Sequence, residues 1–195
     1  MIRHERFTPW TEAGPYRIDD YRRYDGDERC ELLSGRFLVV PAPSNRHQTV
    51  VGLLHETFQV AARANGGRVL AGPADVVLSD ETVVQPDLYY VAEERVSIVG
   101  PQETHGAPDI VVEVLSPGSR RRDRIEKLDE YARGGVSEYW IVDPEDQVFQ
   151  FLELIDGDYR VVVVEGDEYR SKYCSALALD VPAFWADFAR MAPRG

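Results

Sequence analysis

Two carboxylates lie beside strongly apolar segments of the chain. Glu113 interrupts the run Ile110–Leu115, and Asp87 directly precedes the run Leu88–Val91. A buried carboxylate needs a cation, a hydrogen-bond network or a raised pKa. On neighbouring strands of one sheet, the two acids would form a compact oxygen site of the kind that binds Mg²⁺. The structural alternative is that Asp87 caps a turn and Glu113 pairs with an arginine.

Lys127 is the third residue with potential chemistry. It lies between Ile125 and Leu128 and one helical turn before Tyr131. It therefore borders the predicted apolar stripe of a helix, from which its long side chain can reach back over the strand that carries Glu113.

A cluster of arginines lies between the strand of Glu113 and Lys127. Its members are Arg120, Arg121, Arg122 and Arg124. Because phosphates dominate the affinity of proteins for nucleic acid, this cluster suits a phosphate-binding lip of the site. The alternative is a solvated helix face that is paired with neighbouring acids.

Composition limits the classes of protein and of partner. The 195 residues contain 22 Lys and Arg against 34 Asp and Glu, which gives a net charge of -12 and argues against a broad nucleic-acid-coating surface. Cys30 and Cys174 lack the spacing of a disulfide framework or a zinc site. No apolar run is long enough for a membrane span, and the N-terminus lacks a signal-like apolar region. We expect one cytoplasmic domain over residues 1–195, with no membrane partner.

Helices and strands alternate along the chain, which predicts an α/β fold. The expected helices are 18–24, 45–65 with Ser44 as the N-cap, 121–133 with Ile125 in its apolar stripe, and 183–191. The expected strands are 30–33, 36–40, 68–71, 75–78, 87–91, 96–99, 109–115, 137–142, 147–154 and 159–164. Apolar residues on both faces of 109–115 indicate a central, covered strand in one mixed sheet.

The order of these motifs resembles a known family. Pro86-Asp87, Glu113 in Pro-Asp-Ile-Val-Val-Glu-Val-Leu-Ser-Pro, Lys127-Leu128 with Tyr131, and Gly135 to Pro144 follow one another as in the Uma-type family of bacterial restriction-endonuclease-like proteins. That family belongs to the PD-(D/E)XK nuclease superfamily. The segments Cys30 to Arg36 and Pro43 to Gln48 resemble the same family, so the resemblance covers about residues 16 to 190.

The resemblance implies an αβββαβ core with a mixed curved sheet and additional hairpins. It also implies a Mg²⁺-dependent endonuclease that hydrolyses DNA, with Mn²⁺ as a substitute metal. Asp87 and Glu113 match the two metal-binding acids. The superfamily's strand lysine is replaced here by Leu115, and Lys127 is its expected stand-in.

Two further residues match motif positions of the family. Glu31 would supply another metal ligand, with an edge-strand pair to Arg36 as the alternative. For His47 we place a helix-capping or packing role ahead of metal ligation.

Two other functions remain open at this stage: an inactive nucleic-acid or protein binding module of the same fold, and a hydrolase of a small phosphorylated substrate. We also predict a homodimer, because restriction-type nucleases commonly use paired sites. The apolar residues 161–164, with Phe149, Phe151 and Tyr159, offer a surface for it.

Overall fold

The computed structural model describes residues 14–116 and 125–193, so the predictions for Arg120, Arg121, Arg122 and Arg124 lie outside the described residues. Within these ranges the helices are α1 (Ile18–Arg23), α2 (Asn45–Asn65), the 3-10 helix η1 (Glu93–Ile98), α3 (Lys127–Gly134) and α4 (Val181–Met191). The strands are β1 (Cys30–Leu33), β2 (Arg36–Val39), β3 (Arg68–Ala71), β4 (Asp75–Ser79), β5 (Thr82–Val84), β6 (Leu88–Val91), β7 (Glu103–His105), β8 (Ile110–Val114), β9 (Glu138–Asp143), β10 (Val148–Ile155), β11 (Asp158–Val161), β12 (Glu168–Arg170) and β13 (Ala178–Asp180). The predicted α/β class is confirmed.

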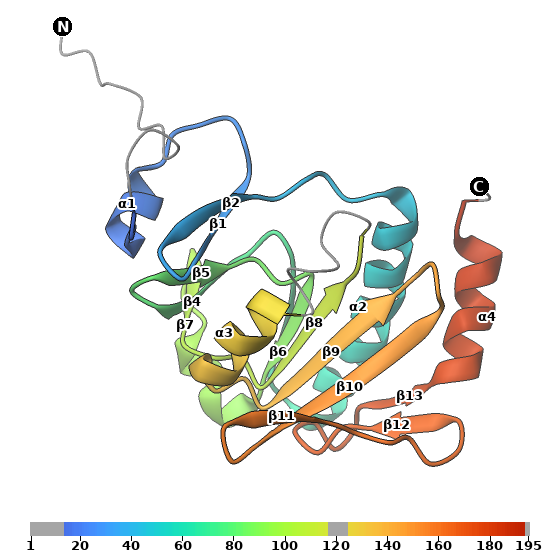
Figure 1. The fold of residues 1–195 in the computed structure, drawn as a ribbon. Coiled ribbons are helices and arrows are strands. Elements are labelled where there is room, and N and C mark those ends of the chain that lie inside the picture. The colour runs from blue at the N-terminus through green and yellow to red at the C-terminus, as the bar shows by residue number, and fades with distance from the viewer. Residues whose placement is uncertain (1–13, 117–124, 194–195) are drawn as a thin grey trace, which may run out of the picture.

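A mixed sheet forms the centre of the described molecule. Its strand order is β11-β10-β9-β8-β6-β3, in which β8 and β9 are parallel and the other neighbours are antiparallel. Every residue of β8 and β9 is buried, as the apolar pattern of 109–115 predicts for a strand covered on both faces. Figure 1 shows α3 in front of this sheet and α2 behind it.

The helix α2 follows its sequence signals closely. Ser44 accepts a hydrogen bond from the His47 amide at the first turn, which is the N-cap interaction that its side chain predicts. The helix ends before Gly66, whose φ of 82° lies in the region that glycine adopts without steric cost. Its apolar face packs on the central sheet, and His47 of its first turn is buried.

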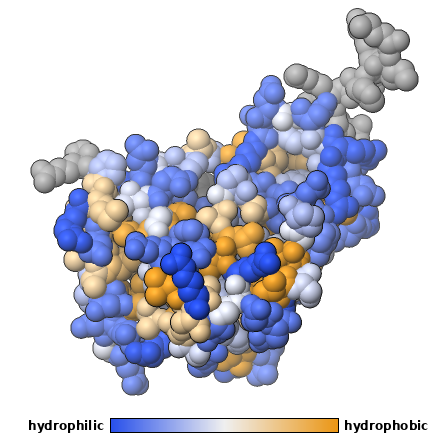
Figure 2. Space-filling model, turned by 180° about the vertical axis from the view of Figure 1, so that it is seen from behind, coloured by the Kyte–Doolittle hydropathy of each residue, from blue (hydrophilic) through white to orange (hydrophobic). Residues whose placement is uncertain are grey.

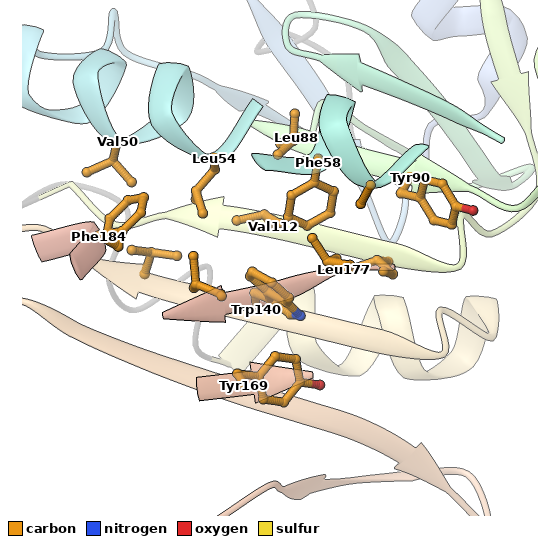
Figure 3. Packing of buried hydrophobic residues seen from close by; sticks show 14 of the residues in the cluster. Val50, Leu54, Phe58, Leu88, Tyr90, Val112, Trp140, Tyr169, Leu177 and Phe184 are labelled. Carbon is orange, nitrogen blue, oxygen red and sulfur yellow. The ribbon is translucent and has the colours of Figure 1, made fainter. Parts of the chain in front are cut away.

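The core behind the central sheet is rich in aromatic side chains. Figure 3 shows Leu54 and Phe58 of α2 directed toward Val112 and Trp140 of the sheet. The rings of Phe58 and Trp140 meet edge-on, with centroids 5.0 Å apart. Residues of β12, β13 and α4 complete this cluster, so the C-terminal segment belongs to the same core.

A second sheet packs on the other face of the central sheet, where the sequence predicted a single sheet. Its order is β2-β1-β5-β4-β7, and its buried residues share a cluster with the front face of the central sheet and with Tyr131 of α3. The strands β5 and β7 were not predicted, because three-residue strands carry too little alternation to be recognised. The two sheets enclose the segment between β5 and β6 that contains Asp87.

Two local predictions were wrong. Residues 96–99 do not form a strand, since 93–98 are the 3-10 helix η1. Arg95 in that helix binds the Asp109 carboxylate and the Ala107 carbonyl, which holds the turn against the sheet. Ile125 is 55% exposed and is not part of an apolar stripe. The buried face of α3 instead carries Lys127, Glu130 and Tyr131: Tyr131 joins the apolar cluster, and Lys127 and Glu130 meet polar partners.

The rear surface combines apolar and hydrophilic regions. Figure 2 shows apolar surface gathered in the middle of this face, with hydrophilic side chains around and across it. Among the described residues, no helix combines the length and the apolar character that a bilayer crossing requires.

Candidate active site

The strand register brings Asp87 and Glu113 to the same end of two neighbouring strands. Leu88 of β6 pairs with Val112 of the antiparallel strand β8, so the preceding residue Asp87 lies opposite Glu113. Both side chains line one cavity of about 40 Å³, together with Lys127. The predicted convergence of these three residues is therefore present, although residues 87 and 127 are far apart in the chain.

One oxygen of the Asp87 carboxylate is held from two sides. Oδ2 accepts the Val114 amide at 2.8 Å and lies 3.0 Å from His47 Nε2. Because an ionised carboxylate only accepts hydrogen bonds, His47 Nε2 carries the proton of this contact. The backbone amide of His47 takes part in the N-cap of α2, and its side chain orients Asp87. The sequence predicted a capping or packing role for His47. Oδ1 of Asp87 receives no hydrogen bond within residues 14–116 and 125–193.

Lys127 joins two buried carboxylates. Its Nζ lies 2.8 Å from Glu31 Oε1 and 2.7 Å from Glu113 Oε1, and the residue is only 2% exposed. Glu31 Oε1 also accepts the Gln85 amide at 2.8 Å. Lysine is almost never buried to this extent unless it is paired. The carboxylates of Glu31 and Glu113 stabilise the buried ammonium group of Lys127.

Tyr131 adds a neutral donor to Glu113. Its hydroxyl donates to Glu113 Oε1 at 2.6 Å. Burial, together with the negative charge of Glu113, raises the pKa of Tyr131 well above its ordinary value, so the phenol stays protonated at neutral pH. Lys127 and Tyr131 are four residues apart and share one face of α3, which is why both reach the same oxygen.

The helix α3 is fixed in place by Glu130. Its carboxylate accepts hydrogen bonds from Ser34 Oγ at 2.5 Å and from Thr82 Oγ1 at 2.6 Å. Ser34 lies in the β1–β2 turn and Thr82 begins β5, so the second sheet holds the helix that delivers Lys127. This contact between acid and hydroxyls has no signal in the sequence, because its partners are far apart in the chain.

The structural alternative for Glu31, an edge-strand pair with Arg36, is wrong. The strand β1 has neighbours on both sides, β2 and β5, so Glu31 is not on an edge strand. Arg36 pairs with Glu126, at 2.9 Å, instead of with Glu31. Among the described residues, the cation found beside Glu113 is Lys127, where the alternative named an arginine.

Three residues of the site had no predicted role. Tyr131 binds Glu113, while Gln85 and Arg29 line the cavity beside Asp87. The spacing of Tyr131 from Lys127 is a signal that points to a shared helix face. Arg29 and Glu31 are two residues apart along an extended segment, which places their side chains on the same face of the sheet. Gln85 is recognisable only by its closeness to Asp87.

The donors around the cavity suit a hard cation. Within the described ranges, no three His, Cys, Asp or Glu side chains group as a metal-binding cluster. Mg²⁺ needs only one or two carboxylates, because it keeps several waters. Asp87, Glu113 and Gln85 line the cavity, and the amide oxygen of Gln85 is buried without a hydrogen-bond partner among the described residues. This oxygen-only set fits Mg²⁺ or Mn²⁺.

Comparisons with known proteins agree with this geometry. Residues 18–182 match the model of the family Uma2, described as "Putative restriction endonuclease". No curated protein matches the chain. The crystal structure of "a putative nuclease belonging to DUF820" from Anabaena variabilis is similar, with a TM-score of 0.72 and 16% sequence identity, over 89% of this chain and 99% of that chain. At that identity the likeness shows a shared fold.

Proposed function

This chain belongs to the Uma2 family of putative restriction endonucleases, and on that premise we propose that it hydrolyses phosphodiester bonds of DNA with a divalent metal ion. Family membership supports the nuclease function, and the similar fold of a putative nuclease agrees with it. DNA as the substrate and Mg²⁺ as the cofactor are our proposals beyond family membership.

One observation carries the metal proposal. Asp87 is held through Oδ2 by His47 and by the Val114 amide, so its other oxygen is presented without a partner among the described residues. Glu113 and Gln85 line the same cavity, and the amide oxygen of Gln85 has no hydrogen-bond partner in the part of the chain that the structure describes. A carboxylate that is fixed by one oxygen and open at the other has the orientation that outer-shell contacts give to metal ligands.

The residues of the chain have separate tasks in this proposal. Asp87 and Glu113 would hold Mg²⁺, or Mn²⁺ in its place, and the bound ion supplies polarisation of the phosphate and a lowered pKa for a coordinated water. His47 fixes the orientation of Asp87. Glu31 fixes the position of Lys127, and a direct ligand role for Glu31 remains a prediction.

We propose that Lys127 stands in for the lysine that the superfamily carries on its strand. The residue two positions after Glu113 is Leu115, which is buried and uncharged. Lys127 reaches Glu113 from α3 instead, and its Nζ lies within hydrogen-bond distance of that carboxylate. We assign it the task of stabilising negative charge that develops on the phosphate during hydrolysis.

Cleavage of supercoiled plasmid DNA tests the proposed function. We expect nicking by the wild type in Mg²⁺ and none in EDTA. The variant Asp87→Asn removes the charge of one ligand while keeping its shape, so we expect at least about a 100-fold lower rate. Asp158→Asn, at the exposed first residue of β11, is the matched control and should cleave at the wild-type rate.

Thermal melts separate a metal site from a merely structural ion pair. Mg²⁺ should raise the Tm of the wild type and leave the Tm of Glu113→Gln unchanged, because a ligand that binds only the folded state stabilises it. In EDTA this variant should lose about 1–3 kcal/mol, since Lys127 keeps Glu31 as a partner. An Mg²⁺ response that is equal in both proteins, or absent from both, would contradict the metal site.

DNA binding without cleavage would favour the inactive binding module.

A further inference from the structure

We infer that Arg29 binds the substrate phosphate at the cavity of Asp87 and Glu113. The inference rests on the proposed function and deepens it, because it names the cation that contacts the anionic substrate. Arg29 lies directly before β1 and lines this cavity together with Asp87, Glu113 and Lys127.

Arg29 lines the cavity and has hydrogen-bonding capacity to spare. Its Nε is buried and has no hydrogen-bond partner, and no ion pair joins Arg29 to a carboxylate of residues 14–116 or 125–193. The backbone at this point is fixed, since the Arg29 carbonyl accepts the Val40 amide at 2.8 Å. A buried donor without a partner costs free energy, so a site that retains one is suited to an acceptor supplied by a ligand.

Two other basic side chains that the structure describes near the site are already engaged. Lys127 is enclosed between Glu31 and Glu113. Arg46, at the start of α2, contacts the Glu145 carboxylate and the Pro144 carbonyl. Among the cations that the structure describes at this cavity, Arg29 is therefore the one whose donors are not bound to protein carboxylates.

Charge and shape favour phosphate as the ligand. An arginine carries five donors in a planar fork that matches two phosphate oxygens, and it remains protonated at all relevant pH values. Arg29 also lines a second cavity, of about 560 Å³, where the carboxylates of Glu28, Asp75 and Glu103 lie with Arg22 and Arg29 as the cations. At the cavity of Asp87 and Glu113 the two carboxylates are balanced by Arg29 and Lys127, so this cavity repels an anion less.

Inorganic phosphate is the probe for this site, because it requires no cleavage. Phosphate titrated into the wild type, at constant ionic strength, should raise the Tm in a saturable manner. Arg29→Gln should bind phosphate about 10- to 100-fold more weakly, as expected for the loss of a charge-assisted hydrogen bond. Arg190→Gln makes the same change of charge on the exposed end of α4 and should respond as the wild type does. Arg29→Lys keeps the charge but loses the fork, and should bind with intermediate affinity.

A fluorescent DNA duplex gives an independent measurement. In Ca²⁺, the slope of log Kd against log salt should fall by about 0.9 in Arg29→Gln, which corresponds to one lost phosphate contact. A purely structural role of Arg29 would leave this slope unchanged.

Chemical modification tests the inference without a variant, in case Arg29→Gln does not fold. Phenylglyoxal followed by mass spectrometry should modify Arg29 of the wild type, and phosphate should protect it. Equal modification with and without phosphate, or equal phosphate affinity in the wild type and Arg29→Gln, would overturn the inference. If the wild type does not cleave DNA but phosphate binding depends on Arg29, the proposed function fails while the anion site stands.

Discussion

Lys127 is the residue on which the buried charges of the site depend. It lies between Glu31 and Glu113, and all three residues are at most 3% exposed. Without the ammonium group, two carboxylates would face each other in a medium of low dielectric constant. A buried ion pair is weak evidence for stability as a whole, but removal of one partner strands the other.

We therefore expect Lys127→Met to lower the free energy of unfolding by about 3–5 kcal/mol at neutral pH, measured by urea denaturation in EDTA. Lys172→Met is the control, since Lys172 pairs with Glu153 but its side chain is 70% exposed, and its effect should be much smaller. The double variant Lys127→Met with Glu31→Gln removes one of the two stranded charges and should recover part of the loss. A Lys127→Met protein as stable as the wild type would contradict the central role of this lysine.

Among the structural elements, the β12–β13 hairpin is attached to the central sheet through a buried acid. Glu138, the first residue of β9, accepts hydrogen bonds from Trp140 Nε1 at 2.5 Å and from Ser171 Oγ at 2.7 Å. Burial raises the pKa of Glu138, the two hydrogen bonds partly oppose this shift, and the charge of Glu153 adds to it. The hairpin is therefore joined to the sheet by a carboxylate that is more easily protonated in the folded state than in the unfolded chain.

The stability of the protein should depend on pH through Glu138. Because its pKa is raised on folding, its favourable contribution is complete below the pKa of the unfolded chain and is lost as the pH rises through the folded value. The Tm of the wild type relative to Glu138→Gln should thus fall between acidic and neutral pH. Melts of both proteins in parallel buffers measure this difference. A constant or rising difference would show that the buried carboxylate is not the cause.

For the molecule as a whole, the homodimer remains a prediction, but the structure changes the surface that we expect to form its interface. Phe151 is buried in the core and Phe149 packs against Phe184 of α4, so these aromatics do not form an exposed patch. Val161 and Val163 are 66% and 83% exposed, and β11 is the last strand of the central sheet in the described order. Val161 ends β11 and Val163 follows it, so exposed apolar side chains lie beside an edge strand, and such an edge favours pairing with another chain.

We expect a homodimer that forms through the β11 edge. Light scattering should give twice the 22.1 kDa mass of the chain, and Val163→Lys should shift the mass toward the monomer. Val60→Lys is the control, because Val60 is also exposed but lies on α2. A monomer mass for the wild type would contradict the prediction, and a dimer that only Val60→Lys disrupts would place the interface on α2.

Elements with strong local signals were predictable from the sequence. Ser44 and Gly66 mark the two ends of α2 because capping and left-handed backbone are local properties. The apolar run around Glu113 predicted a strand that is covered on both faces, which is the position of β8. The cost of burying Glu113 predicted that it needs a cation, a hydrogen-bond network or a raised pKa, and the place of Lys127 on its helix predicted that its side chain can reach back over this strand. The structure shows that Lys127 does reach the Glu113 carboxylate.

The remaining contacts were decided by the tertiary structure. Glu31 reaches Lys127, and Glu130 reaches Ser34 and Thr82, only because a second sheet packs against the first and encloses α3. The register of β6 against β8 sets Asp87 opposite Glu113, and α2 brings His47 to the same carboxylate. Composition and periodicity predict which face of a helix or strand is buried. Which charged side chains meet depends on how the helices and strands pack together. The packing arrangement is the one that minimises the free energy of the whole core, and it can override the preference of any single segment.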